Sequence, residues 1–173
     1  MEEFDIAIIG GGPAGIMAAI AASADLNIVL LEKNSSLGSK LLITGGGRCN
    51  ITNEKPIKKL LNSFHDKNFL KHSFYTFTNE MLLDLFRNRG LDFIVEDNNR
   101  VFPETEKSQD ILAILKYYLK DITIKYNYEV SDIKKEDNFI INNDIIAEKV
   151  IIATGGATFP KTGSTGDGYY LTD

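Results

Sequence analysis

The stretch Gly10-Gly11-Gly12-Pro13-Ala14-Gly15 decides the fold class of this chain. It follows an apolar, β-branched run at residues 4–9 and leads into an alanine-rich run at residues 14–22, which predicts a strand, a tight turn and a buried helix. A second apolar run, Ile28-Val29-Leu30-Leu31, completes a βαβ unit of about 30 residues. Because both runs are almost wholly apolar, we expect parallel strands that are covered on two faces.

The three spaced glycines of this stretch have separate roles in a dinucleotide-binding turn. Gly10 permits the tight turn, Gly12 lets the backbone approach a pyrophosphate, and Gly15 lets the helix pack closely on the strand. Glu32 ends the second strand about 20 residues later, where a carboxylate accepts hydrogen bonds from the adenosine ribose and repels the 2′-phosphate of NADP. The alternative is a plain tight turn followed by a solvated glutamate, and the strand–turn–helix context disfavours it.

Length, composition and charge exclude several classes of protein. The chain has 173 residues, of which 43% are hydrophobic and 25% charged, as in a globular protein with one domain or one domain plus an appendage. Its net charge of −5 argues against a general nucleic-acid-binding surface but leaves room for a local basic patch. No apolar stretch approaches the ~20 residues that cross a bilayer. The acidic N-terminus does not fit a signal peptide, although Ala21-Ala22-Ser23-Ala24 loosely imitates a cleavage site.

The cysteine and the histidines of the chain give no sign of disulfides or of a metal site. Cys49 is the single cysteine, so it forms no internal disulfide, and no metal-ligand cluster surrounds it. We therefore expect a cytoplasmic protein without a metal site. A redox role for Cys49 would need a second cysteine, so a packed small residue beside a cofactor is the favoured interpretation. His65 and His72 are expected to be surface or packing residues.

The glycine pattern alone does not distinguish FAD from NAD, because both cofactors contain the ADP half that it binds. The strand at Val150-Ile151-Ile152-Ala153 provides the distinction. This strand ends in Ala153-Thr154-Gly155-Gly156 after a small antiparallel meander. Flavoproteins with two dinucleotide-binding domains show this order, whereas a simple NAD-binding domain continues with further βα units. The order favours FAD.

A second glycine-rich segment, Thr44 to Asn53, is expected to be a long loop that meets the flavin. Gly45, Gly46 and Gly47 expose backbone N–H groups and let a flat isoalloxazine approach. Arg48 supplies positive charge near the flavin N1, and Asn50 supplies an adaptable amide. The alternative is a flexible loop with an ordinary surface arginine.

Two further segments allow two interpretations each. Residues 162–168, Thr-Gly-Ser-Thr-Gly-Asp-Gly, suit contacts to the flavin or a substrate, or equally an ordinary surface turn. Arg100, on a hairpin, either holds an anionic group or is simply exposed, and exposure is favoured.

The remaining elements follow from hydrophobic periodicity and turn signals. Residues 34–53 are expected to be loop. Helices are expected within residues 56–77, at 81–86 between a start at Thr78 or Asn79 and a stop at Gly90, and after an N-cap at Ser108. Strands are expected at 91–95 and 100–102 as a hairpin, at 122–124, at 130–135, 139–141 and 145–146 as a meander, and at 150–153.

These motifs together resemble one family. The chain is similar to the YhiN/BaiN-like (aminoacetone-oxidase-like) FAD-binding flavoproteins, which are NAD(P)/FAD-dependent oxidoreductases, and the runs at 44–53 and 153–168 carry the most specific part of the resemblance. It implies a Rossmann-like FAD/NAD-linked reductase fold, a parallel α/β sheet with a small antiparallel meander, divided into residues 1–55, an inserted region at 56–110, and residues 111–173.

The resemblance also implies a function and a set of contacts. It implies an FAD-binding oxidoreductase reduced by NAD(P)H, acting on a small-molecule substrate without nucleic acid or membrane. The residues implied as FAD contacts are Gly10, Gly12, Pro13, Ala14, Gly15, Glu32, Lys33, Lys40, Gly45, Gly46, Gly47, Arg48, Cys49, Asn50, Val130, Ala153, Thr154, Gly155 and Gly156.

Family members are considerably longer, so we expect this chain to match only their N-terminal part. The sequence assigns no catalytic acid or base, no substrate and no oligomeric state. Two alternatives remain open: a dinucleotide-binding module that is truncated or needs a partner, and an NAD-only dehydrogenase.

Overall fold

The structure is a computed structural model that describes residues 1–22 and 25–172. Part of the segment that imitates a cleavage site, Ser23-Ala24, lies outside the described residues. The chain forms two compact units: residues 1–41 together with 115–173, and residues 42–114.

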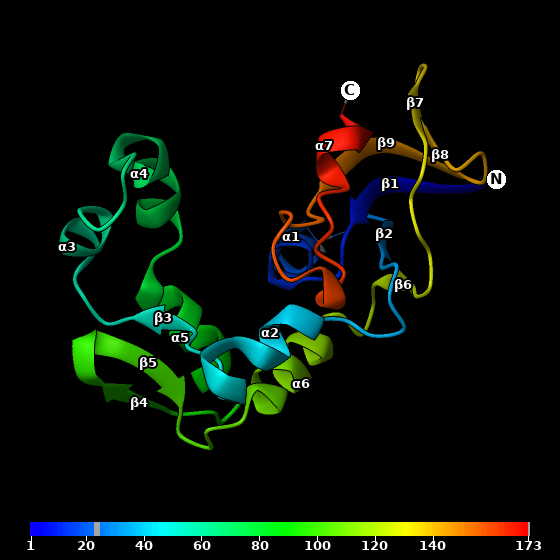
Figure 1. Cartoon of the computed structure of the whole chain (residues 1–173). Helices are drawn as coiled ribbons and strands as arrows, with labels where there is room; N and C mark the ends of the chain where they lie inside the picture. Colours follow the sequence, from blue (N-terminus) through cyan, green and yellow to red (C-terminus); the bar gives the residue numbers. More distant parts are fainter. Residues whose placement is uncertain (23–24, 173) are drawn as a thin grey trace. The chain divides into compact units, whose positions relative to one another are not determined.

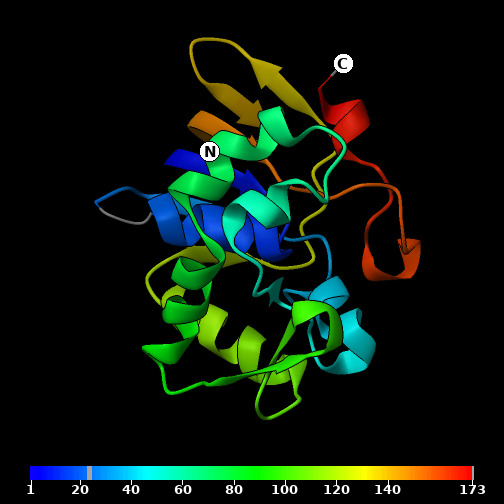
Figure 2. The same ribbon diagram turned by 90° about the vertical axis from the view of Figure 1, so that its left-hand side faces the viewer.

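The first unit is built on a six-stranded sheet with the order β6-β2-β1-β9-β8-β7 (Figure 1). Its strands are β1 (Glu2–Ile9), β2 (Ile28–Leu31), β6 (Thr123–Lys125), β7 (Ile133–Lys135), β8 (Phe139–Ile141) and β9 (Ile145–Ile152). β1 pairs in parallel with β2 and β9, and β6 pairs in parallel with β2. β7, β8 and β9 form the antiparallel meander, whose β7–β8 hairpin is drawn in gold in Figure 2.

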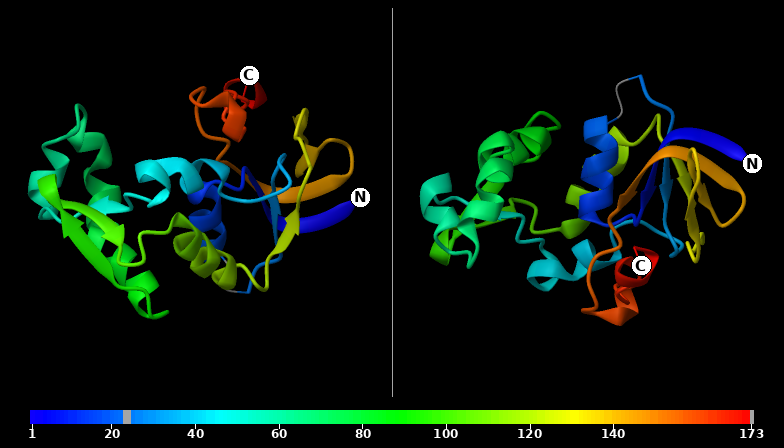
Figure 3. Two further views of the ribbon diagram at one scale, coloured as in Figure 1. Left: turned by 60° about the horizontal axis from the view of Figure 1, so that its bottom comes forward. Right: turned by 90° about the horizontal axis from the view of Figure 1, so that it is seen from above.

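Helix α1 (Pro13–Ala22) connects β1 to β2 and contacts both strands as well as β9. Figure 3 shows α1 lying along the sheet. Ile8, Leu30 and the helical Ile16 are completely buried. Alternation along the strands directs the neighbouring Ile9 and Leu31 to the opposite face, where they join a core cluster with residues of the meander. This arrangement confirms the predicted parallel α/β sheet with a small meander.

The second unit holds a three-stranded antiparallel sheet with the order β3-β5-β4. Its elements are η1 (Thr44–Gly47), β3 (Thr52–Asn53), α3 (Ile57–Leu61), α4 (Lys67–Thr76), α5 (Asn79–Arg87), β4 (Phe93–Glu96), η2 (Asp97–Asn99) and β5 (Arg100–Pro103). The predicted hairpin is confirmed, and so is the start of α5, where the Thr78 side chain accepts a hydrogen bond from the Met81 N–H.

The chain passes between the units at α2 (Ser39–Ile43) and α6 (Ser108–Tyr118), and the first unit ends with η3 (Pro160–Thr162) and α7 (Gly168–Leu171). Among the described residues, no helix is both long and apolar enough to cross a membrane.

Three expectations about elements are wrong. Residues 34–53 are not one loop, because they contain α2, η1 and β3. The buried Leu41 stabilises the helical turn α2, although the surrounding glycine and serine residues are typical of a loop. The strands expected at 145–146 and 150–153 are a single strand, β9, whose exposed Glu148-Lys149 resembles a break in the sequence. Ser108 is not an N-cap, because it is the first residue of α6 and its hydroxyl donates to the Leu42 carbonyl oxygen.

Candidate dinucleotide-binding site

The turn from β1 into α1 places its three spaced glycines in three different environments. Gly10 has a φ of +107°, and a Cβ added there would lie 2.5 Å from the Ala153 carbonyl oxygen. A Cβ on Gly15 would lie 1.9 Å from the Gly10 carbonyl oxygen, so the helix can approach this turn only without a side chain. A Cβ on Gly12 would meet no atom within 4 Å. The backbone at Gly12 therefore faces open space, into which a ligand can come close.

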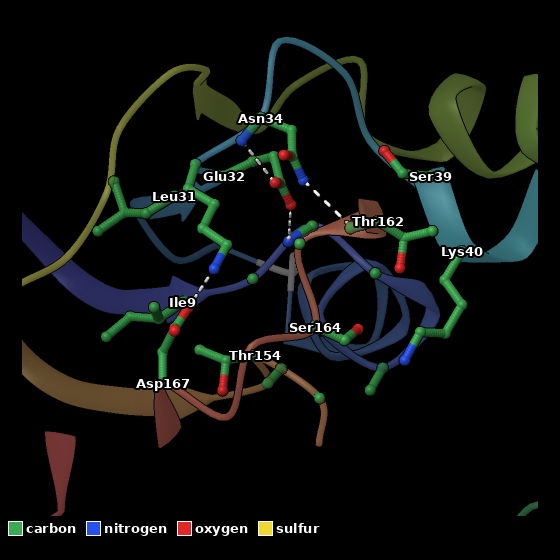
Figure 4. A pocket seen from close by; sticks show the side chains of 18 of the residues that line it. Ile9, Leu31, Glu32, Asn34, Ser39, Lys40, Thr154, Thr162, Ser164 and Asp167 are labelled. Atoms are coloured by element: carbon green, nitrogen blue, oxygen red, sulfur yellow. Dashed lines mark hydrogen bonds and ion pairs between the residues drawn. The ribbon is translucent and has the colours of Figure 1, made fainter. Parts of the chain in front are cut away.

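A pocket lies over this turn, at the carboxyl ends of β1, β2 and β9, where α/β sheets bind their ligands (Figure 4). The N-terminus of α1 adds unpaired N–H groups and a partial positive charge, which favour phosphate. Most of the residues expected to contact FAD line this pocket: Gly10, Gly12, Pro13, Ala14, Glu32, Lys33, Lys40, Val130, Ala153, Thr154 and Gly155.

Glu32 is fixed in this pocket by two backbone groups. Its Oε2 accepts from the Gly11 N–H and its Oε1 from the Asn34 N–H, both at 2.7 Å, and only 6% of the residue is exposed. Hydrogen bonds to a charged group contribute about 1.5–3 kcal/mol each. Each carboxylate oxygen keeps a second lone pair, so a ribose hydroxyl can still donate to it.

The glycine-rich segment at residues 162–168 forms part of the pocket wall and passes beside Lys33 and Asn34 (Figure 4). Lys33 Nζ lies 2.5 Å from Asp167 Oδ2 and donates to Thr165 Oγ1 at 2.6 Å. Asn34 Nδ2 donates weakly to the Thr162 carbonyl oxygen at 3.4 Å. Of the two interpretations of this segment, these contacts favour pocket wall over a detached surface turn.

The ion pair determines the charge of Asp167. Burial alone would raise the pKa of its carboxyl, but hydrogen bonds from Lys33 and Thr165, together with the positive charge of Lys33, hold that pKa below its ordinary value. Both side chains are about one quarter exposed, at 23% for Lys33 and 27% for Asp167. Lys33 is therefore engaged by protein groups, in addition to the cofactor contact that the sequence implies.

Three further polar residues of the pocket were not identified from the sequence: Asn34, Ser39 and Tyr128. Asn34 follows Glu32 closely enough that its position was a usable signal. Tyr128 carried no such signal, because it reaches the pocket only through the pairing of its N–H with the Glu32 carbonyl oxygen. Its hydroxyl bonds to Asp144, and burial together with this carboxylate raises the pKa of Tyr128.

Two predicted residues of the first unit lie outside the pocket lining. Gly15 packs beneath it against Gly10, and Gly156 lines a shallower hollow beside Tyr169. The segment Gly45, Gly46, Gly47, Arg48, Cys49 and Asn50 belongs to the second unit.

In the second unit, Arg48 is engaged by acidic and aromatic groups. Its Nη1 lies 2.6 Å from Glu96 and 2.9 Å from Glu106, and its guanidinium carbon is 4.1 Å from the centre of the Phe102 ring. The bond from Arg48 holds the pKa of Glu96 below its usual range. Arg100 also bonds to Glu96 and is exposed, as the favoured interpretation of that residue expected.

Cys49 is buried, and burial raises the pKa of its thiol, which opposes thiolate formation and agrees with a packing role. Gly46 and Asn50 remain exposed, and a Cβ on Gly46 would meet no atom within 4 Å. His65 and His72 are exposed. Within the described residues, no group of three or more His, Cys, Asp or Glu side chains is arranged to hold a metal ion.

Comparison with known proteins supports this interpretation of the fold. The model of the HI0933-like protein Rossmann domain matches residues 4–173. The 3-dehydro-bile acid delta(4,6)-reductase of Clostridium scindens is 33% identical over 96% of this chain and 42% of its own length. The ribosomal RNA dihydrouridine synthase of Escherichia coli is 30% identical over 100% of this chain and 44% of its own length. The chain thus spans less than half of these relatives.

A solved structure gives the same fold. The open conformation of a flavocytochrome c3 fumarate reductase superposes with a TM-score of 0.65 and 20% identity, over 90% of this chain and 34% of that one. At this identity the match establishes the fold alone, and it confirms the Rossmann-like flavoprotein fold expected from the sequence.

Proposed function

The chain belongs to the HI0933-like family of Rossmann domains, and from this premise we propose that it forms the FAD-binding part of a flavin-dependent oxidoreductase. The observation that carries the proposal is the β1–α1 turn. Gly10 and Gly15 have no room for a Cβ, while Gly12 lines the pocket and faces open space. Two crowded glycines around an open one, at a helix N-terminus that lines a pocket, are what a pyrophosphate-binding turn needs.

The pocket residues fit the ADP half of FAD. The turn with Pro13 and Ala14 would hold the pyrophosphate at the α1 N-terminus, and Glu32 would accept from the ribose. Lys33, Lys40, Val130 and Ala153 to Gly156 would border the same half. Gly45 to Asn50 would serve the flavin half. When bound, FAD supplies a two-electron carrier that takes hydride from one substrate and gives it to another.

The names of the relatives suggest the class of reaction. A delta(4,6)-reductase of a 3-dehydro-bile acid and a dihydrouridine synthase are both named for hydrogenating a carbon–carbon bond conjugated with a carbonyl group. For this chain we infer reduction of such a bond in an organic acceptor, with NAD(P)H as the external reductant and the cytoplasm as its compartment.

The substrate class has two candidates. A free small molecule is favoured by the reductase relative and was expected from the sequence. An RNA nucleotide is favoured by the relative named as a ribosomal RNA dihydrouridine synthase. The overall charge of −5, on which the expected absence of a nucleic-acid partner was based, leaves room for a local basic patch.

The absorbance spectrum of the purified chain, before and after incubation with FAD, tests this function. We expect flavin absorbance to remain with the protein after gel filtration, and anaerobic titration with NADH and NADPH then identifies the reductant. A chain that stays colourless after incubation would contradict the proposal. Retained FAD that neither nicotinamide reduces would support the alternative of a dinucleotide-binding module without turnover of its own.

A further inference from the structure

We propose that helices α3 and α4 form a binding surface for single-stranded RNA. The surface comprises residues 55–77, which we call the basic helical pair, and all of it belongs to the second unit. The choice of RNA among polyanions rests on the proposed reductase function, because one relative of the chain is named for a reaction on ribosomal RNA. The binding itself requires no flavin.

Charge distinguishes this surface from the rest of the molecule. The chain has a net charge of −5, yet the basic helical pair contains five lysines and a single acidic residue, Asp66. Asp66 is already used, because its carboxylate caps α4 by accepting from the Phe69 N–H. Among the described residues, none of these five lysines lies in an ion pair, whereas Arg48, Arg87 and Arg100 of the same unit all pair with carboxylates. Unpaired, clustered lysines are what phosphate binding requires.

Exposed aromatic side chains are interspersed with these lysines along the chain. α4 has no buried residue along its whole length, and Phe69 and Tyr75 are 79% and 54% exposed. Lys67, Lys71 and Tyr75 follow one another at intervals of four residues, so they share one face of α4. A face that carries two ammonium groups followed by a flat ring can hold successive phosphates while a base stacks on the ring.

The same features argue against an anionic membrane as the partner. A helix that lies in a membrane interface has a continuous apolar face opposite its basic face. In α4 the half-buried Phe74 instead packs within the unit, where its ring centre lies 5.4 Å from that of Phe64, and the exposed Phe69 and Tyr75 lie on different faces of the helix. An unpaired RNA strand offers both the phosphates and the accessible base faces that this surface would recognise.

The test is fluorescence anisotropy of a labelled single-stranded RNA of about 16 nucleotides, titrated with the whole chain in the presence of FAD. We expect Lys67→Ala/Lys71→Ala to weaken binding on the order of tenfold and to lower the salt dependence, because two phosphate contacts are lost. Tyr75→Ala should weaken binding about fivefold or more, whereas Tyr75→Phe, which keeps the ring, should bind as the unmodified chain does.

The matched control is Lys116→Ala/Lys120→Ala, which removes two exposed lysines at the same spacing from the first unit. The proposal is overturned if the unmodified chain does not bind the RNA, if the control weakens binding as much as the α4 pair, or if phosphatidylglycerol vesicles bind through these lysines and RNA does not. Flavin absorbance of the same samples tests the two proposals separately. A chain that retains FAD but does not bind RNA contradicts only the RNA-binding surface. A chain that binds RNA but does not retain FAD contradicts only the proposed flavin function.

Discussion

At the scale of single residues, Gly12 is expected to matter for FAD binding and Gly15 for folding. We expect Gly12→Ala to leave the stability of the cofactor-free chain within about 0.5 kcal/mol, because its Cβ enters open space. It should weaken FAD binding about tenfold or more, because the methyl group keeps the pyrophosphate from the backbone N–H groups. Urea unfolding and fluorescence titration with FAD measure the two effects.

Gly15→Ala is the matched comparison at the other end of the same turn. Its Cβ would lie 1.9 Å from a backbone oxygen, so the helix must shift, and we expect a loss of about 1–3 kcal/mol or more in the free energy of unfolding. If Gly12→Ala unfolds the chain, or if Gly15→Ala leaves its stability intact, the assignment of the two glycines is wrong.

Glu32 has a structural role that can be measured without cofactor. A glutamine of the same shape can accept from only one of the two N–H groups that the carboxylate satisfies, those of Gly11 and Asn34. We therefore expect Glu32→Gln to lower the free energy of unfolding of the cofactor-free chain by about 1–3 kcal/mol. Glu148→Gln, on an exposed position of β9, should change it far less. Equal stabilities would mean that the carboxylate is dispensable for folding.

The sequence predicted these residues because their roles are local. A glycine pattern between a strand and a helix, and an acidic residue at the end of the next strand, follow from the geometry of one βαβ unit. Lys33 was assigned to the cofactor from the family resemblance, and its pairing with Asp167 joins residues 134 positions apart. Only the folded chain brings these two together. The paired state of Arg48 was hidden for the same reason, since Glu96 is 48 positions away.

At the scale of elements, the segment at residues 157–168 is held to Lys33, just after β2, through an ion pair that depends on pH. The pKa of Asp167 is lowered in the folded chain, so the stabilisation is present above the ordinary carboxyl pKa of 3.8 and is lost as the pH falls through the lower, folded value. At pH 7 we expect Asp167→Asn to accelerate hydrogen exchange in this segment. Below about pH 4 the unmodified chain should approach the variant, after correction for intrinsic exchange rates.

The control for this prediction is Asp137→Asn, an exposed aspartate in the β7–β8 turn. It should leave exchange in residues 157–168 unchanged at every pH. Protection that is identical in Asp167→Asn and the unmodified chain at pH 7 would show that other contacts hold the segment.

The sequence predicted those elements that its hydrophobic pattern or turn residues indicate, such as α1, α5 and the β4–β5 hairpin. The errors arose where composition hid the packing. α2 is a five-residue helix in a serine- and glycine-rich stretch, and its stability comes from the burial of Leu41 rather than from helix propensity. β9 was divided because Glu148 and Lys149 interrupt an apolar pattern, although exposed polar residues are compatible with a continuous strand.

At the scale of the whole molecule, the residues expected to contact FAD are divided between the two units, so the assignments to the ADP half and to the flavin half can be tested separately. The pocket of the first unit carries the residues expected to hold ADP, while the exposed Asn50 of the second unit was assigned to the flavin half from the sequence. ADP and FAD therefore probe the two assignments independently. If both assignments hold, a variant of the second unit should affect FAD binding and spare ADP binding.

We expect Asn50→Ala to weaken FAD binding about fivefold, the loss of one hydrogen bond, and to leave the affinity for ADP unchanged. Asn68→Ala, on an exposed position of α4, should change neither affinity. Competition of ADP against FAD, followed by flavin fluorescence, gives both values for each variant. If Asn50→Ala binds FAD as tightly as the unmodified chain, Asn50 makes no contact with the flavin half. If it weakens ADP equally, the effect comes from folding, because ADP lacks the half of the cofactor that Asn50 was assigned to recognise.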